Sequence, residues 1–334
     1  MPKSSRMETR AVTFVGVEQA QVVPVEVSAP GVGQLLVRTE VSCVSPGTEL
    51  RCLRGLERGS DDWPFIPGYA IVGEVIAVGP NTQTPVGQRV YCNGTQDASV
   101  RLMWGGHCGL ACVTEASVFP VPDGVPSRDA VFAHMAAIAY RGVRMAQVLP
   151  TDRVAVIGLG PIGQLSFRLF ALTGAAVVGL DPDSSRVELA QRAGGSAIVV
   201  GDSLEASCRI EFPTGADVVV DATGVPAVFN EAVKCARDRP WSNVDLPGSR
   251  IIVQGSYARE FSVDYPSLFL REATMAFPRD AQPQDFAAML GLMRRGALNL
   301  TGLAGDIVTP EQAPDLYARL LDRTPGLLTA LIQW

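Results

Sequence analysis

The chain has 334 residues, more than one hydrophobic core usually supports, so two domains are expected. Apolar residues make up 47% of it and charged residues 19%, which is the balance of a soluble globular protein. A net charge of −6 argues against nucleic acid or an anionic membrane as a partner, and no apolar run approaches the roughly 18 residues that a membrane span needs.

The cysteines and the N-terminus indicate the compartment. Seven cysteines, an odd number, are scattered from Cys43 to Cys235 without a repeating spacing, which predicts reduced thiols. Residues 1–6 are not followed by an apolar segment, so we expect no secretory signal. Together these features predict a cytoplasmic protein.

The first 120 residues have the pattern of an all-β domain. Short runs rich in β-branched residues alternate with Gly, Pro and Asn turn signals, the clearest at 30–31 and 79–81. Strands at this spacing predict a partly open β-barrel. The expected strands include 11–15, 35–41, 71–78 and 89–91.

The periodicity then changes to that of a helix, over residues 129–149, which Pro150 ends. A buried strand at 154–158, a glycine turn, a helix at 164–172 and a second strand at 176–181 follow. In such a unit Gly158 forms the tight turn, Gly160 lets the backbone approach a pyrophosphate, and Gly163 lets the helix pack closely. The turn predicts a dinucleotide site, completed by Pro161 and Ile162 at the start of the helix.

An acid follows this site at the expected distance. Asp181 lies 18 residues beyond Gly163, close to the roughly 20 expected for a carboxylate that binds the adenosine ribose. Because this carboxylate would repel a 2′-phosphate, we predict NAD as the cofactor rather than NADP. Arg186 lies close enough in sequence to weaken that preference.

Alternation of strands and helices continues beyond Asp181. We expect helices at 184–193 and 227–236 and strands at 197–200, 217–221 and 250–254, hence an α/β fold with a doubly wound parallel (Rossmann) sheet. Such sheets bind ligands beyond the carboxyl ends of their strands. The candidates at two of those ends are Ala222, Thr223, Gly224, Gln254 and Gly255.

After residue 270 the alternation is lost. Helices at 285–295 and 310–321 and a strand at 327–334 are expected, and the last segment is expected to return to the first domain. The predicted organisation is therefore a Rossmann domain, 129–270, inserted into a barrel domain made of 1–128 and 271–334.

Several motifs occur in an order that resembles the medium-chain dehydrogenase/reductase superfamily, of the alcohol and sorbitol dehydrogenase type. They are the glycine turn, a second expected turn at residues 45–49, and residues 67–73, 85–90, 121–125 and 217–224. The resemblance implies a GroES-like barrel domain, a bilobed enzyme that binds NAD(P) in the cleft between its lobes, and hydride transfer to or from a carbonyl. It is weaker for the subgroup that contains the bacteriochlorophyllide hydroxyethyl dehydrogenases.

The chain departs from that family at the zinc site that many members carry. The three ligand positions correspond to Pro46, Tyr69 and His134, and the acid beside the second is replaced by Ala70. Proline cannot bind a metal and a neutral tyrosine is a poor zinc ligand, while a catalytic site needs three protein ligands. The four-cysteine lobe that holds structural zinc is also missing. We therefore predict no metal.

Without zinc, hydrogen-bond donors must stabilise the alkoxide formed in hydride transfer. We expect Tyr69 and His134 to surround the substrate oxygen, with Thr48 matching a proton-relaying hydroxyl of zinc members and Glu49 orienting its neighbours. Other interpretations stay open: a packed barrel tyrosine, a core histidine and a simple turn residue at Thr48. His107, beside glycines, is expected to be structural.

The predicted function is a zinc-independent oxidoreductase that transfers a hydride between NAD(H) and a secondary alcohol or ketone, such as a polyol, a sugar-like compound or a secondary metabolite. One alternative is an NADPH-dependent enone or quinone reductase, against which Asp181 argues. Another is a catalytically inactive nucleotide-binding protein. The partners expected are a small-molecule substrate and, by resemblance, a second copy of the chain in a homodimer paired through the strand at 250–254.

Overall fold

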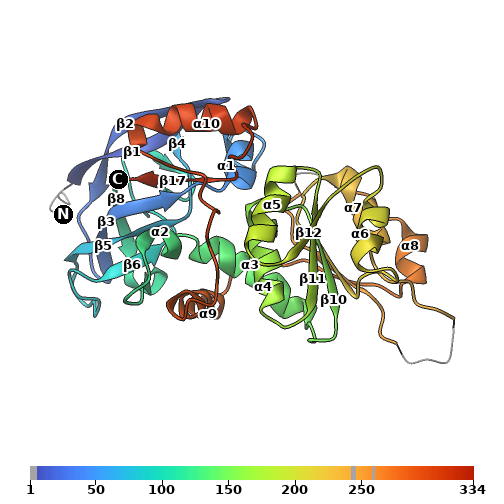
Figure 1. Cartoon of the computed structure of the whole chain (residues 1–334). Coiled ribbons are helices and arrows are strands. Elements are labelled where there is room, and N and C mark those ends of the chain that lie inside the picture. Colours follow the sequence, from blue (N-terminus) through green and yellow to red (C-terminus); the bar gives the residue numbers. More distant parts are fainter. Residues whose placement is uncertain (1–5, 242–245, 258–259) are drawn as a thin grey trace. The chain divides into compact units, whose positions relative to one another are not determined.

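The computed structural model describes residues 6–241, 246–257 and 260–334, in two compact units (Figure 1). Unit 1 comprises residues 1–134 and 304–334, and unit 2 comprises residues 135–303. Residues 1–5, which belong to the stretch that predicts no secretory signal, lie outside the described part. Within that part, no helix combines the length and the apolar character needed to cross a membrane.

Unit 1 is built on two sheets. A four-stranded sheet has the order β2-β1-β4-β7, and a larger one has the order β16-β17-β3-β5-β6-β9, with β8 also pairing β3. Its strands are β1 (Arg6–Gly16), β2 (Gln19–Ser28), β3 (Gln34–Cys43), β4 (Phe65–Ile66), β5 (Ile71–Val78), β6 (Arg89–Cys92), β7 (Arg101–Leu102), β8 (Leu110–Thr114), β9 (Phe119–Pro120), β16 (Asp306–Val308) and β17 (Ala330–Gln333). β17 pairs antiparallel with β3, which confirms that the last strand returns to the first domain.

The helices of unit 1 are α1 (Pro46–Leu53), α2 (Ser127–Ala130) and α10 (Ala313–Leu321), with short 3₁₀ turns at Glu115–Ser117 and Pro310–Gln312. Helix α10 closes a core in which Phe14, Leu53 and Tyr317 are buried together. Residues 45–49 were expected to form a turn, but they begin helix α1. Pro46 occupies the first helical position, where its missing N–H costs nothing, and the Glu49 carboxylate accepts the Ser45 N–H at 2.7 Å.

Unit 2 contains the predicted doubly wound sheet. Its six strands are all parallel, in the order β12-β11-β10-β13-β14-β15, and run β10 (Arg153–Ile157), β11 (Ala176–Asp181), β12 (Ser196–Val199), β13 (Val218–Asp221), β14 (Arg250–Val253) and β15 (Thr274–Ala276). Its helices are α3 (Ala133–Ala146), which crosses the boundary between the units, α4 (Pro161–Ala171), α5 (Ser184–Arg192), α6 (Leu204–Glu211), α7 (Pro226–Lys234), α8 (Tyr265–Leu270) and α9 (Pro283–Arg294). In Figure 1, α4 and α5 cover one face of the sheet, and α6 and α7 cover the other.

Two expectations about this unit are wrong in detail. Residues 271–303 belong to unit 2, because β15 adds a sixth parallel strand beside β14 and the Arg144 guanidinium on α3 pairs with the buried Asp285 carboxylate of α9 at 2.5 Å. The strand at 250–254 is not at the edge of the sheet. It lies between β13 and β15, so the exposed edge is β15, which is only three residues long and gives little periodic signal.

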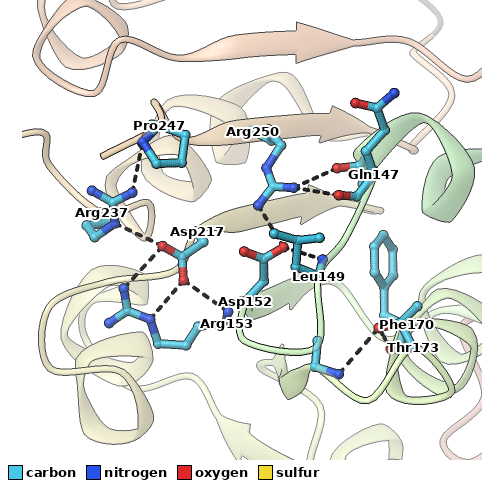
Figure 2. Close-up of polar contacts among 12 residues, drawn as sticks. Gln147, Leu149, Asp152, Arg153, Phe170, Thr173, Asp217, Arg237, Pro247 and Arg250 are labelled. Atoms are coloured by element: carbon cyan, nitrogen blue, oxygen red, sulfur yellow. Dashed lines mark hydrogen bonds and ion pairs between the residues drawn. The ribbon is translucent and has the colours of Figure 1, made fainter. Parts of the chain in front are cut away.

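The amino ends of the central strands are joined by ion pairs (Figure 2). The Asp217 carboxylate, just before β13, accepts hydrogen bonds from the guanidinium groups of Arg153 at 3.0 Å and Arg237 at 2.9 Å. Arg250 pairs with Asp152 at 2.8 Å and donates to the carbonyl oxygens of residues 146 and 147. These contacts fix the strand ends that face away from the glycine turn.

Candidate functional site

The glycine turn joins β10 to α4 in unit 2, as predicted. Gly158 has φ +84°, and a Cβ placed on it would lie 2.8 Å from the Thr223 side chain. A Cβ on Gly163 would lie 1.8 Å from the Gly158 carbonyl oxygen, so a side chain there would force the helix away from the strand. Both positions therefore require glycine for reasons of space.

The start of α4 is open to a ligand. A Cβ on Gly160 would meet no atom within 4 Å, so the backbone at the helix start is uncovered. Pro161 is the first helical residue and lacks an N–H, and the next N–H groups, of Ile162 and Gly163, have no carbonyl within the helix to bind. These donors, at the positive end of the helix dipole, fit the pyrophosphate of a dinucleotide.

Asp181 ends β11 beside this turn. Its carboxylate is 3% exposed and accepts the Leu159 N–H at 2.7 Å and the Asp183 N–H at 2.9 Å. Each oxygen keeps a second lone pair for a ribose hydroxyl. The Arg186 guanidinium lies 3.5 Å from the same carboxylate and is 42% exposed, so the cation that weakened the NAD prediction is a direct neighbour of the acid.

The other predicted cofactor residues follow the neighbouring strands. Thr223 donates its N–H and its hydroxyl to the buried Asp221 carboxylate, at 3.0 and 2.7 Å, and Tyr257 also donates to that carboxylate. The chains after β13 and β14 touch, since a Cβ on Gly255 would lie 2.3 Å from the Gly224 nitrogen.

Two of these cofactor candidates are placed by contacts within unit 2. Ala222 lies next to α4, because its Cβ is 3.5 Å from the position that a Cβ on Gly163 would occupy. Gln254 is buried and its amide donates to the Ile138 carbonyl at 3.1 Å, so its side chain is directed to α3.

The predicted catalytic residues Thr48 and Tyr69 meet at Ser45 in unit 1, and His134 lies beside Tyr69. The Tyr69 hydroxyl donates a hydrogen bond to the Ser45 hydroxyl at the start of α1. Burial raises the pKa of Tyr69 well above its usual value, although hydrogen bonds with Ser45 and Thr48 act in the opposite direction. Tyr69 therefore keeps its proton at neutral pH and can donate a hydrogen bond. The hydroxyl groups of Ser45, Thr48 and Tyr69 form one cluster.

Aromatic rings surround this cluster. The ring of the buried His134 is 5.0 Å from the Tyr69 ring, and its Nδ1 lies 3.5 Å from the Tyr69 carbonyl oxygen. The Trp104 ring meets Tyr69 edge to face at 5.7 Å and is 43% exposed. The Tyr91 hydroxyl donates to the Tyr69 carbonyl at 2.9 Å. Tyr69 is thus held on several sides.

Glu49 lies behind the cluster. Its wholly buried carboxylate accepts hydrogen bonds from His107 at 2.9 Å, from Tyr317 and from the Ser45 N–H. Sequence reasoning missed Ser45, Trp104 and Tyr317 as neighbours of the site. Ser45 is the first residue of the motif at 45–49 and could have been found there, whereas Tyr317 is 268 residues from Glu49 and gave no local signal.

The residues at the family's zinc positions do not form a set of metal donors. Pro46 has no donor atom. The Tyr69 hydroxyl is bound to Ser45, and its raised pKa disfavours the phenolate that a metal would require. Among the described residues, no group of three or more His, Cys, Asp or Glu side chains could hold a metal ion. His134 alone does not fit a catalytic zinc.

Comparison with known proteins identifies both units. Residues 31–123 match the alcohol dehydrogenase GroES-like domain, which confirms the predicted barrel, and residues 161–295 match the zinc-binding dehydrogenase family. The 2-desacetyl-2-hydroxyethyl bacteriochlorophyllide A dehydrogenase of Rhodobacter capsulatus is 24% identical, over 98% of this chain and 99% of its own length. The L-galactonate-5-dehydrogenase of Escherichia coli is 26% identical, over 82% of this chain and 84% of its own.

Solved structures share the fold. An Escherichia coli CFT073 protein described as a short chain alcohol dehydrogenase, solved with NADH, has a TM-score of 0.84 at 19% identity and covers 98% of this chain and 99% of its own. A zinc-binding dehydrogenase, described as putative, from Sinorhizobium meliloti 1021 with bound NADP has a TM-score of 0.83 at 20% identity, covering 98% and 100%. The glycine turn, the parallel sheet and the two matched domains place this chain in the medium-chain dehydrogenase/reductase superfamily of oxidoreductases.

Proposed function

We propose that this protein is a zinc-independent dehydrogenase that interconverts a secondary alcohol and its ketone with NAD(H). The observation that carries the proposal is the hydroxyl cluster of Ser45, Thr48 and Tyr69. Its Tyr69 corresponds, by resemblance, to a zinc-ligand position of the family. A hydroxyl cluster can hold a substrate oxygen by hydrogen bonds. In zinc-dependent enzymes the metal holds and polarises that oxygen by coordination.

The chemistry divides between two residues. Bound NAD(H) supplies the hydride acceptor or donor. In both directions Tyr69 donates a hydrogen bond to the substrate oxygen in place of Ser45, and its raised pKa keeps the proton on the phenol. His134 exchanges the proton: a neutral imidazole accepts it from the alcohol during oxidation, and the imidazolium returns it to the alkoxide during ketone reduction, since the two directions follow one path in reverse.

The cofactor is NAD rather than NADP under this proposal. The buried Asp181 carboxylate would repel a 2′-phosphate, and its oxygens are oriented by the Leu159 and Asp183 N–H groups. Arg186 is the observation that favours the second candidate, an NADPH-dependent enone or quinone reductase, since its exposed guanidinium could bind a 2′-phosphate. Nicotinamide fluorescence titrations with NADH and NADPH decide between them: tighter NADPH binding would favour the reductase.

The substrate class rests on the names of relatives. They include a hydroxyethyl bacteriochlorophyllide dehydrogenase, an L-galactonate dehydrogenase and a D-guloside 3-dehydrogenase, the last also 26% identical. These names support a panel of polyols, sugar-like compounds and secondary-metabolite alcohols as the first substrates to test.

The test combines metal analysis with turnover of that panel. We expect NAD(H)-dependent turnover that persists after chelator treatment, without stoichiometric zinc. We also expect Tyr69→Phe to lower kcat by about 100-fold, the usual cost of removing one hydrogen-bond donor to a developing oxyanion, and to leave NADH binding unchanged. Tyr265→Phe, at an exposed tyrosine of α8, is the matched control. Stoichiometric zinc required for turnover, or a fully active Tyr69→Phe variant, would overturn the proposal.

We also propose a homodimer, paired through β15 rather than β14. No strand among the described residues pairs with the outer edge of β15, and large exposed apolar side chains lie on α8 and beside the strand: Tyr265, Phe269, Leu270 and Phe277. Exposed strand edges with apolar surroundings commonly pair with another chain. Sedimentation should show a dimer that the double substitution Tyr265→Glu and Phe269→Glu dissociates; an unchanged sedimentation coefficient would contradict this interface.

A further inference from the structure

A continuous network of buried polar groups lies beneath the hydroxyl cluster of unit 1. The Trp334 indole N–H donates to the Ser42 hydroxyl at 2.9 Å, and Ser42 is 2.8 Å from Nδ1 of His107. Nε2 of His107 is 2.9 Å from Glu49, which Tyr317 also contacts. Ser42, His107 and Glu49 have no exposed surface, so water cannot complete their hydrogen bonds.

The donors and acceptors of this network select one form of His107. Indole can only donate, and a carboxylate can only accept, so Nε2 carries a proton. If Nδ1 also carried one, the Ser42 hydroxyl would accept twice and its own proton would have no acceptor among the described residues. The neutral form with hydrogen on Nε2 satisfies every group, as buried polar atoms require.

The ring of His107 also contacts the backbone that carries Tyr69. Gly68 has φ +83°, and a Cβ on it would lie 2.7 Å from Cδ2 and Nε2 of His107. The His107 N–H donates to the Pro67 carbonyl at 3.0 Å. One side chain therefore touches the loop that leads into Tyr69 and, through Glu49, the Ser45 N–H at the start of α1.

We propose that His107, as its neutral Nε2–H form, is the positioning residue of the catalytic hydroxyl cluster: it fixes Glu49 and the Gly68 backbone and so aligns Ser45 and Tyr69. The inference rests on the proposed function of that cluster. It also gives Glu49 a defined role, because the carboxylate orients the helix start rather than the substrate. Glu49 has no Arg or Lys partner among the described residues, so the three uncharged donors hold it alone.

The first test is made on the unmodified protein and needs no substrate. The chain has only two histidines, so a protein labelled with ¹⁵N-histidine gives two imidazole spectra, and His134→Asn assigns them. We expect His107 to show a single protonated nitrogen, Nε2, at about pH 7, as the hydrogen bonds of the network require. A doubly protonated ring or a proton on Nδ1 would overturn the assignment, whatever the protein's reaction.

The second test separates positioning from general stability. His107→Gln keeps an N–H close to the place of Nε2, whereas His107→Phe fills the space without a donor. We expect kcat to fall about 100-fold in His107→Phe, the cost of a misplacement of about 1 Å, and to recover to within about tenfold of the wild type in His107→Gln, with KM for the cofactor unchanged in both. Equal loss of kcat in two folded variants, or full activity of His107→Phe, would overturn the role. If no alcohol is oxidised by the wild type, the proposed function fails instead, and the ¹⁵N spectra still decide the form of His107.

Discussion

Two carboxylates, one in each unit, are held by opposite kinds of hydrogen-bond donor, charged in one case and uncharged in the other. In unit 2 the Asp217 carboxylate lies between two guanidinium groups, those of Arg153 and Arg237, at the amino ends of the strands (Figure 2). In unit 1 the wholly buried Glu49 carboxylate has only uncharged donors, from Ser45, His107 and Tyr317. The first arrangement fastens the amino ends of central strands, opposite the glycine turn, and the second supports a candidate catalytic cluster.

The difference matters because of what each carboxylate does to its neighbours. Asp217 is surrounded by compensating charge. Glu49 keeps an uncompensated negative charge that contributes, after burial itself, to raising the pKa values of Cys43 and Tyr317, and it acts in the same direction on Tyr69. The negative charge of Glu49 therefore favours the protonated form of Tyr69, which we propose as the hydrogen-bond donor to the substrate oxygen.

The largest expected effect comes from removing the carboxylate that has no cationic partner. Glu49→Ala leaves the Ser45 N–H, the His107 Nε2–H and the Tyr317 hydroxyl buried without an acceptor, and each orphaned donor costs about 1–3 kcal/mol. We expect the free energy of unfolding, measured by urea denaturation, to fall by about 4 kcal/mol.

Glu49→Gln serves as the control for that prediction. It keeps one carbonyl oxygen as an acceptor but introduces an amide that can donate, so about half of the loss should remain. A Glu49→Ala variant destabilised by less than about 1 kcal/mol would show that the three donors find other partners or water, which contradicts the closed network described above.

Sequence reasoning found the parts of this molecule that depend on local pattern. Gly158, Gly163 and Asp181 lie within one strand, turn and strand, and the requirement for glycine there is a matter of backbone space that any Cβ would violate. Tyr69 and His134 were brought together by resemblance to ligand positions, and the structure places their rings 5.0 Å apart. Their catalytic roles stay predictions.

What the sequence concealed depends on contacts between distant segments. The turn expected at 45–49 is a helix start because the Glu49 carboxylate holds the Ser45 N–H from inside the core. The edge of the sheet was expected at 250–254, but it is β15, a strand too short to show an alternation of apolar and polar residues. His107 was expected to be structural, and its neighbours Ser42, Glu49 and Trp334 come from three other segments of the chain.

A smaller effect is expected at the carboxylate with cationic partners. Asp217→Ala leaves Arg153 and Arg237 without their acceptor, but these side chains are 28% and 11% exposed, so water takes over part of the hydrogen bonding. We expect a loss of about 2 kcal/mol of unfolding free energy. The NADH dissociation constant should not change, because the ion pairs lie at the strand ends opposite the glycine turn. Weaker NADH binding by Asp217→Ala would show that the ion pairs also affect the cofactor site.

The smallest effect is a dependence of stability on pH at the paired carboxylate, Asp217. Burial alone would raise the pKa of Asp217, but hydrogen bonds from Arg153 and Arg237 outweigh it and hold that pKa below its ordinary value. Its stabilising contribution is therefore complete above the unfolded-state pKa of about 4 and is lost as the pH falls through the lower folded-state pKa. The difference in unfolding free energy between the wild type and Asp217→Asn, measured by urea denaturation from about pH 7 down to pH 3, should be flat above about pH 5 and shrink below about pH 4. A difference that grows on acidification would mean that burial, and not the two guanidinium groups, dominates the pKa of Asp217.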